Sequence, residues 1–440
     1  MQPEASPQAA SMRNTFTVGS AAWTGATEHT DEYAERIVQF LKYTDESALC
    51  DYASGLRNGI DCTVCPEFAV GSNHMVRKLR FEDGKEWVAR MRMPPIWGDD
   101  DLGSGAMNVA MSSELATMAF VRQNTDIKAP QVHGFDLDID NDVGCVFVLM
   151  DYIPGSTAEA VSRLYNPGDD EGAIPAQFRD RFWRQLAGIM ARLASVRLPK
   201  IGSIYRESSN PGAFATGPIA ETLSGPYDSA AAFYLDYPLR LARRLAIGKP
   251  ALEGQDALLR AFTRVVAASF IRPTRSVDEE GAEDEEDECG GFGLANYGLG
   301  PSNVLVDAEF NILGVIDWGS VMALPEAALH RFPRRMGVDA AIPGWSGEDA
   351  DVSEVERERW DRGHRFAKAV ERQARHDEDD DCVVFPFTAA GFYSREAVAF
   401  RALAEMRSRQ GARVSEAWVW GLDWLAEHND EELARFYADN

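Results

Sequence analysis

The sequence predicts an α+β protein with a β-rich N-terminal part and a mainly helical C-terminal part. Between residues 65 and 150, short apolar or alternating runs are separated by turn signals such as Glu82-Asp83-Gly84, which is typical of antiparallel strands. From Phe178 onward, apolar residues recur at three- and four-residue spacing, which predicts helices. The 440 residues are enough for two domains or for one bilobal unit.

The composition favours a folded protein with reduced thiols. Apolar residues make up 45% and aromatic residues 10% of the chain, enough for a sizeable core. No run of about twenty apolar residues predicts a membrane span, and residues 1–7 lack the pattern of a secretory signal. The six cysteines are scattered, which favours free thiols. We therefore predict a cytoplasmic protein that does not bind a membrane.

The formal net charge of −26 argues against non-specific binding of nucleic acid. Steering of a cationic small substrate is one interpretation of this charge. Much of it, however, lies in two blocks, 278–288 and 377–381, and such blocks are typical of solvated loops. We therefore predict no nucleic-acid partner and infer nothing about the charge of a substrate.

The N-terminal elements follow from local patterns. Residues 1–30 predict a loose tail, and residues 31–43 predict a short helix because their apolar residues have helical spacing. Residues 68–81 predict two strands around a Gly-Ser-Asn turn, and residues 86–91 predict a third strand.

Cys62-Thr63-Val64-Cys65 is a C-x-x-C motif, which is compatible with redox chemistry or with half of a zinc site. No second pair of Cys or His lies nearby at metal spacing, and no βαβ pattern follows. We favour a structural pair of cysteines without chemistry.

The C-terminal part is predicted to be helical. Serines that can cap a helix stand at Ser394 and Ser415, and Asn429-x-x-Glu432 has the spacing of a capping box. Longer helices are predicted at 178–196 and 230–245 from their apolar periodicity.

A hairpin near residue 310 brings together two side chains that carry oxygen. Two apolar runs flank the polar break 307–311, which favours a chain reversal. Asn303 precedes the first run and Asp317 ends the second, so both side chains can reach one point. An amide oxygen and a carboxylate suit Mg²⁺, which is usually bound by about one or two carboxylates and by the phosphates of a nucleotide. An ordinary surface hairpin is the alternative.

The run Leu299-Gly300-Pro301-Ser302-Asn303-Val304-Leu305-Val306-Asp307, followed by Val315-Ile316-Asp317-Trp318, resembles the catalytic core of the aminoglycoside phosphotransferase family, in a branch common in filamentous fungi. The resemblance covers about residues 60–330. It implies a bilobal protein-kinase-like fold with ATP and Mg²⁺ as cofactors, and it makes Asn303 and Asp317 the metal ligands.

The resemblance also implies a division of the chain. Residues 31–150 would form the nucleotide-binding lobe, and residues 151–440 would form a helical lobe that contains the catalytic hairpin and an acidic loop at 277–290.

Four more residues take roles from the resemblance. Arg90, on the third predicted strand, would be the cation that meets the phosphates, and Glu114 would pair with it. Main-chain groups of Asp151 and Tyr152 would hold adenine at the hinge. Each has a simpler explanation: a solvated strand face for Arg90, the dipole of a helix beginning at Ser112 for Glu114, and a strand followed by a turn for the hinge.

One departure from the family is decisive for chemistry. The family has His-x-Asp immediately before Leu-Gly-Pro, and that Asp is the catalytic base. Here Asn296 stands at the His position and Gly298 at the Asp position. The chain therefore lacks the family's base.

Three hypotheses about function follow. The first is ATP-dependent phosphoryl transfer to a small-molecule hydroxyl without the base, since such transfer relies mainly on positioning and charge neutralisation. The second is a non-catalytic pseudokinase that binds nucleotide or a metabolite as a sensor or partner. The third is a protein that keeps only the fold, against which Asn303 and Asp317 argue.

Overall fold

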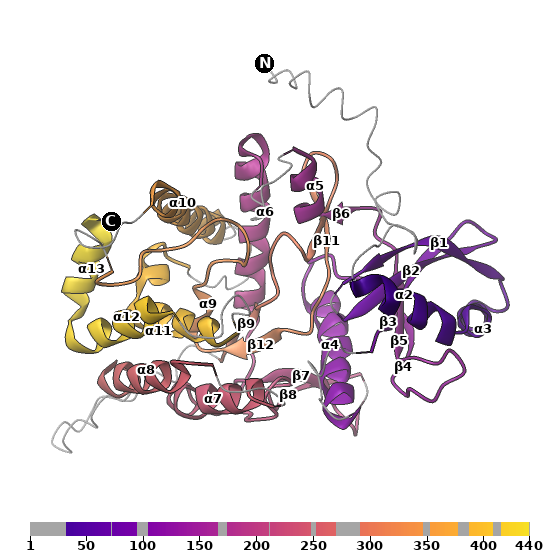
Figure 1. Ribbon diagram of the computed structural model, residues 1–440, viewed down its shortest axis with the longest axis horizontal. Helices are drawn as coiled ribbons and strands as arrows, with labels where there is room; N and C mark the ends of the chain where they lie inside the picture. Colours follow the sequence, from indigo (N-terminus) through magenta and orange to yellow (C-terminus); the bar gives the residue numbers. More distant parts are fainter. Residues whose placement is uncertain are drawn as a thin grey trace. The chain divides into compact units, whose positions relative to one another are not determined.

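The computed structural model describes residues 32–71, 73–94, 104–165, 174–210, 212–247, 252–269, 291–345, 353–376, 387–407 and 415–439. The predicted N-terminal tail and the acidic loop at 277–290 lie outside these residues, as does the block 377–381. The fold class is the predicted one: strands dominate the first part of the chain and helices dominate the second (Figure 1).

The chain divides into two compact units. Unit 1 comprises residues 1–111, 121–178 and 301–316, and unit 2 comprises residues 112–120, 179–300 and 317–440. The division does not follow a single cut in the sequence, because the hairpin strands belong to unit 1 although they come late in the chain.

The core of unit 1 is a five-stranded antiparallel sheet in the order β1-β2-β3-β5-β4. Apolar residues on one face of this sheet pack with residues of two helices, among them Ile37 and Leu49 (Figure 1). The elements are α2 (Glu32–Tyr43), α3 (Glu46–Leu56), β1 (Cys62–Val70), β2 (His74–Phe81), β3 (Glu86–Arg92), β4 (Val132–Asp136) and β5 (Phe147–Asp151).

The predicted hairpin is confirmed, and it forms part of a second sheet in unit 1. Its strands β10 (Val304–Val306) and β11 (Ile312–Val315) pair antiparallel, and β10 also pairs with the short strand β6 (Ser156–Thr157). Helix α5 (Ala158–Tyr165) follows β6 directly. In the turn, Phe310 has a φ of 58° and a fully buried ring, which lies against Phe178.

Unit 2 is mainly helical, with two short two-stranded sheets. Helix α6 begins with the last residues of unit 1, and its buried side chains include Phe182, Leu186 and Leu193, as the periodicity predicted. The elements are α6 (Ala176–Ser195), β7 (Ser203–Arg206), β8 (Phe214–Gly217), α7 (Ala230–Leu245), α8 (Gln255–Ser269), β9 (Gly293–Asn296), β12 (Val321–Leu324), α9 (Glu326–Leu329), α10 (Glu354–His376), η4 (Ala390–Tyr393), α11 (Arg395–Ala402), η5 (Leu403–Arg407), α12 (Glu416–Glu427) and α13 (Asp430–Asp439).

Two of the three predicted caps of the C-terminal helices are confirmed, whereas Ser415 stands at the N-cap of α12 without a capping hydrogen bond from its side chain. The Ser394 hydroxyl accepts the Ala397 N–H at the start of α11. At the start of α13, the Asn429 side chain accepts the Glu432 N–H at 3.0 Å, while the Glu432 carboxylate accepts the Asn429 N–H at 2.8 Å. This reciprocal pair is a capping box, which satisfies two N–H groups that the helix itself leaves without partners.

The predicted start of the helix at Ser112 is wrong. Helix α4 runs from Ser104 to Asn124, so it begins eight residues earlier. Ser113 lies inside the helix, is buried, and donates its hydroxyl to the Ile204 carbonyl at 3.0 Å. Glu114 is therefore in mid-helix, and the helix dipole does not explain its position.

Candidate functional site

The loop before the hairpin, where the resemblance places the catalytic base, begins at Asn296, the last residue of β9. Its side-chain oxygen accepts the Gly298 N–H at 2.8 Å, and its own carbonyl accepts the Leu299 N–H at 3.1 Å. The neighbouring Tyr297 N–H donates to Ser320, beside β12. Asn296 is 3% exposed, so its amide is a buried polar group, and the loop satisfies the oxygen of that amide.

The side-chain nitrogen of Asn296 reaches a second segment of unit 2. Its N–H donates to the Asp317 carbonyl at 3.3 Å. The N–H of the same peptide group, that of Trp318, donates to the Glu114 carboxylate at 3.2 Å. Both polar atoms of the Asp317–Trp318 peptide are thus held by side chains, one from β9 and one from α4.

Asp317, whose peptide group with Trp318 takes part in these two hydrogen bonds, has an unusual backbone conformation. Asp317 has a φ of 62°, in the left-handed region, which is uncommon for residues other than glycine although aspartate adopts it more often than most. Such a conformation is unfavourable by roughly 1–3 kcal/mol and persists where the surroundings fix it. Its side chain is exposed, whereas the next residue, Trp318, is fully buried. The turn therefore anchors Trp318 and presents the Asp317 carboxylate at the surface of unit 2.

Asn303 belongs to unit 1, at the start of the hairpin. Its carbonyl accepts the Ile316 N–H at 2.9 Å, and the residue is half-buried. The hairpin register thus sets Asn303 beside Ile316, the residue before Asp317 in the chain.

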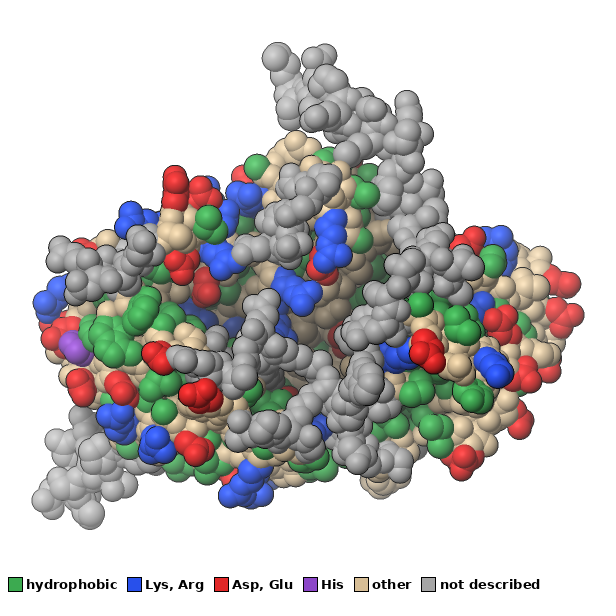
Figure 2. All heavy atoms as spheres, in the orientation of Figure 1, with side chains coloured by type: hydrophobic (Ala, Val, Ile, Leu, Met, Phe, Trp, Pro, Cys, Tyr) green, Lys and Arg blue, Asp and Glu red, His purple; other side chains and the backbone are tan. Residues whose placement is uncertain are grey.

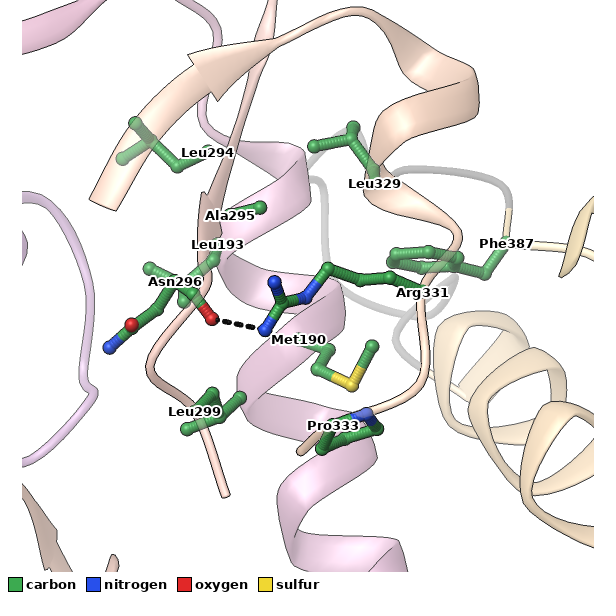
Figure 3. A pocket seen from close by; sticks show the side chains of 10 residues that line it. All are labelled: Met190, Leu193, Leu294, Ala295, Asn296, Leu299, Leu329, Arg331, Pro333 and Phe387. Atoms are coloured by element: carbon green, nitrogen blue, oxygen red, sulfur yellow. Dashed lines mark hydrogen bonds between the residues drawn. The ribbon is translucent and has the colours of Figure 1, made fainter. Parts of the chain in front are cut away.

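The buried residue Arg331 contacts two residues of this loop. The Arg331 guanidinium lies 3.8 Å from the centre of the Tyr297 ring and donates to the Asn296 carbonyl at 2.8 Å. In Figure 3 it points at that carbonyl from one wall of a small cavity, while the Asn296 amide points away. The cavity, about 10 Å³, is lined largely by apolar side chains such as Met190 and Phe387. This volume holds about one water molecule, so the cavity is too small for a substrate.

Arg90 lies on the central strand of the unit 1 sheet, opposite Val76 on β2 and Val148 on β5. Its neighbours Ala89 and Met91 belong to the core beneath α2 and α3. Side chains alternate along a strand, so Arg90 is on the other face. It is half-buried there.

A second cation on the same face was missed by the sequence analysis. Lys78 pairs in register with Val88, two residues before Arg90 on β3. Its side chain is 7% exposed, its Nζ lies 3.0 Å from a Glu86 carboxylate oxygen, and it lies 4.7 Å from the centre of the Tyr152 ring. The alternation within β2 is the signal that would have found it.

At the predicted hinge, Asp151 already uses its main-chain N–H and its carboxylate in contacts within unit 1. The Asp151 N–H donates to the Gln131 carbonyl at 2.9 Å, and its carboxylate accepts the Gln131 N–H and contacts His133 at 2.8 Å. The Asp151 N–H is therefore not available to a bound adenine.

The predicted metal ligands Asp317 and Asn303 belong to different units, and each carries an oxygen donor. Among the described residues, no group of three or more His, Cys, Asp or Glu side chains could hold a metal ion. One carboxylate from Asp317 and one amide oxygen from Asn303 are hard ligands of the type that Mg²⁺ combines with phosphate oxygens.

No family model matches this chain. Solved structures match it over most of its length. They include a macrolide 2′-phosphotransferase from Brachybacterium faecium, with 16% identity, coverage of 89% of this chain and 97% of the other, and a TM-score of 0.44. A thermostable mutant of an aminoglycoside phosphotransferase has 12% identity, coverage of 89% and 99%, and a TM-score of 0.41. The chain is similar to the aminoglycoside phosphotransferase family. An ethanolamine kinase from Plasmodium vivax also matches, with 11% identity, coverage of 100% and 94%, and a TM-score of 0.44. At these identities the likeness concerns the fold alone.

Curated fungal proteins match a shorter part of the chain. "Altered inheritance of mitochondria protein 9, mitochondrial" from Candida tropicalis is 27% identical over 135 residues, and its counterpart from Komagataella phaffii is 33% identical over 138 residues. Each match covers 31% of this chain but only 20% and 21% of these relatives. A "Subtelomeric hrmA-associated cluster protein" from Aspergillus fumigatus is 28% identical over 144 residues, which is 32% of this chain and 25% of that protein.

These names correct one prediction. A cytoplasmic location was predicted from the sequence, and the relatives from Candida tropicalis, Komagataella phaffii and Saccharomyces cerevisiae are named as mitochondrial, which contradicts that prediction. Within the described residues, no helix is long and apolar enough to span a membrane. On the face shown in Figure 2, acidic and basic side chains are interspersed over the described residues.

Proposed function

We propose that the chain binds Mg²⁺–ATP and transfers its γ-phosphoryl group to a small-molecule hydroxyl without a general base from the loop at Gly298. The observation that supports this proposal is a pair of hydrogen bonds to the Asp317–Trp318 peptide group, one from the Asn296 side chain and one to the Glu114 carboxylate. A protein that kept only the fold would have no need to fix an exposed carboxylate in an unfavourable backbone conformation.

The chain's own residues would supply positioning and charge. Asp317 and Asn303 would hold the metal, and Arg90, with Lys78 on the same sheet face, would meet the phosphates. Bound Mg²⁺ would neutralise charge on the phosphates. Phosphoryl transfer depends mainly on such contributions, so their presence is compatible with slow turnover in the absence of a base.

Binding is tested by thermal shift with and without millimolar Mg²⁺–ATP. A ligand that binds only the native state raises the melting temperature. We expect a rise for the wild type and none for Asp317→Asn. Asp228→Asn is the matched control, because that carboxylate is 80% exposed and pairs only at the surface with Lys200. No rise for the wild type would refute nucleotide binding.

A second candidate, a nucleotide-binding protein without catalysis, is favoured by the loop itself. Residues 296–300 contain no carboxylate, and the Gly298 N–H is bonded to the Asn296 side chain. In that case the protein would act as a sensor or a partner for another molecule.

The variant Gly298→Asp separates the two candidates. Gly298 is not one of the described glycines that have a left-handed φ. Its backbone conformation therefore allows an Asp, and the N–H at this position can stay bonded to the Asn296 side chain. A general base contributes about 10²–10⁴-fold. We expect ATP turnover to rise in Gly298→Asp but not in Gly298→Asn, which has the same shape without a base. Undetectable turnover in all three proteins, with nucleotide binding intact, would favour the non-catalytic candidate.

We also propose that the protein works in mitochondria, because the relatives from Candida tropicalis and Komagataella phaffii carry that location in their names. The full chain with a C-terminal fluorescent tag, expressed in yeast, should coincide with a mitochondrial stain. A diffuse signal outside mitochondria would contradict this.

A further inference from the structure

The two cysteines of the C-x-x-C motif are not partners in the structure. Both lie on β1, where each residue advances about 3.3 Å, so Cys62 and Cys65 are about 10 Å apart along the strand. A disulfide spans only about 4.4–6.8 Å between Cα atoms. Cys62 packs with Val64 against the core of unit 1. Cys62 and Cys65 therefore cannot form a disulfide with each other in this conformation.

Cys62 instead meets Cys50, which lies on α3. The Cys62 thiol donates to the Cys50 carbonyl at 3.8 Å, and each thiol is close enough to the other to influence its pKa. Both cysteines are free thiols, both are half-buried, and both pack against the same core. Helix α3 and strand β1 thus bring together two sulfurs that the sequence separates by a turn.

The surroundings distinguish the two thiols. Burial, followed by the proximity of Cys62, raises the pKa of Cys50 to about 12. Burial also raises the pKa of Cys62, but hydrogen bonds from Cys50 and Ser54 and the nearby Arg57 guanidinium act in the opposite direction. The thiolate is the nucleophile in thiol oxidation, and Cys62 is the thiol whose thiolate the nearby Arg57 guanidinium favours.

We propose that Cys50 and Cys62 form a redox-modification site that closes to a disulfide with a peroxide as oxidant. The Cys62 thiolate attacks one peroxide oxygen, which breaks the O–O bond, and gives a sulfenic acid and one water. The Cys50 sulfur then attacks the Cys62 sulfur, its proton leaves with the hydroxide as a second water, and the S–S bond forms. Two thiols lose two electrons, and hydrogen peroxide is reduced to two waters.

The disulfide would tie the end of α3 to the start of β1. It would close a short loop that includes Arg57 and the turn after α3. Closing a loop restricts the unfolded chain, so the oxidised protein should melt at a higher temperature than the reduced one.

The test uses the folded full chain with hydrogen peroxide, followed by alkylation of free thiols and tryptic digestion. Trypsin cleaves after Arg57, so Cys50 and Cys62 fall on different peptides, and the crosslink appears as a linked pair. We expect this pair, a rise of several degrees in melting temperature, and reversal of both by dithiothreitol.

The cysteine variants make the assignment specific. Cys50→Ser and Cys62→Ser should each lower the yield of the linked pair at least tenfold and remove the thermal shift. Cys65 shares the tryptic peptide of Cys62, so Cys65→Ser must leave both effects intact. Cys145→Ser is the matched control, since Cys145 is also a buried free thiol. Loss of the linked pair in Cys65→Ser, or only sulfinic acid at Cys62 in the wild type, would overturn the proposal.

Discussion

At the scale of single residues, Asn296 connects more of the site than any motif suggests. Its amide has both a donor and an acceptor, and it uses them on two different segments, Asp317 and Gly298. Its carbonyl meanwhile serves Leu299 and Arg331. An amide at this position can therefore order the loop and the Asp317 turn together.

Asn296→Ala tests this connection. It removes two hydrogen bonds and leaves the Asp317 carbonyl and the Gly298 N–H without these partners, so we expect a loss of roughly 1–3 kcal/mol in the free energy of unfolding. If the proposed function holds, the thermal shift by Mg²⁺–ATP shrinks as well. Asn141→Ala is the control: Asn141 makes comparable bonds in the β4–β5 turn, and its loss should lower stability but spare the shift.

Glu114 offers a second test at this scale. It is 7% exposed and accepts the Trp318 N–H, so Glu114→Ala leaves a buried donor unsatisfied and should cost about 1–3 kcal/mol in urea denaturation. Glu114→Gln keeps an acceptor oxygen of the same reach and should cost less. Equal losses would mean that the negative charge, rather than the hydrogen bond, is what matters.

The sequence identified Asn296 and Gly298 by their place before the hairpin motif, but it could not reveal what they contact. Arg331, which supports the loop through Tyr297 and the Asn296 carbonyl, comes 35 residues later. Lys78 shares a strand face with Arg90 only because of the register between β2 and β3. Such contacts depend on pairing between distant segments, and local patterns carry no information about them.

At the scale of elements, local signals worked where local chemistry decides. The capping box at Asn429 and the serine cap at Ser394 were predicted and are present. The start of α4 was predicted wrongly: the helix begins at Ser104, and Ser112 and Ser113 lie inside it. The Ser113 hydroxyl bonds to the Ile204 carbonyl, a contact between distant segments that the local pattern does not show.

Arg395 is the residue that joins the last helices. It is buried at the start of α11, and its guanidinium donates to the carbonyls of Leu425 and His428 and binds Asp430 at 2.9 Å. Arg395→Met keeps the apolar stem but removes these bonds. We expect a loss of about 2–5 kcal/mol in the free energy of unfolding, since buried carbonyls lose a charged donor.

The control for this prediction is Arg264→Met. Arg264 on α8 pairs with Asp423 on α12, but their side chains are 54% and 37% exposed, and exposed pairs contribute about 0–1 kcal/mol. Chemical denaturation of the two variants side by side measures the difference. Similar losses for both would show that the burial of Arg395 does not matter.

At the scale of the whole molecule, the fold class followed from periodicity, whereas the composition of the two units did not. The hairpin strand β10 pairs with β6, far earlier in the chain, and this pairing draws residues 301–316 into unit 1. Helix α4 contributes residues to both units. A sequence pattern shows that strands and helices exist, but only non-local contacts decide how they are grouped.

The pH dependence of stability is a property of the whole chain that buried histidines shape. Burial lowers the pKa of His330 to about 4 from an ordinary value of 6.5, and its ring lies edge-on to Phe387 and Phe392. Burial, and then Arg90 and Arg92, also lowers the pKa of His74. Above pH 6.5 both states of each histidine are neutral. Below it the unfolded chain binds the proton first, so stability falls as the pH falls.

His330→Leu isolates one of these protons. Between pH 6.5 and about pH 4 the wild type should lose up to about 3 kcal/mol more stability than the variant, because a difference of one pKa unit corresponds to about 1.4 kcal/mol. Urea denaturation at pH 8.0, 7.0, 6.0, 5.0 and 4.5 measures the two curves. Between pH 7.0 and 8.0 they should run parallel, whatever the offset caused by the change in packing, and below pH 6.5 the wild-type curve should fall more steeply than that of the variant. Curves that stay parallel down to pH 4.5 would mean that His330 is protonated in the folded chain at its ordinary pKa.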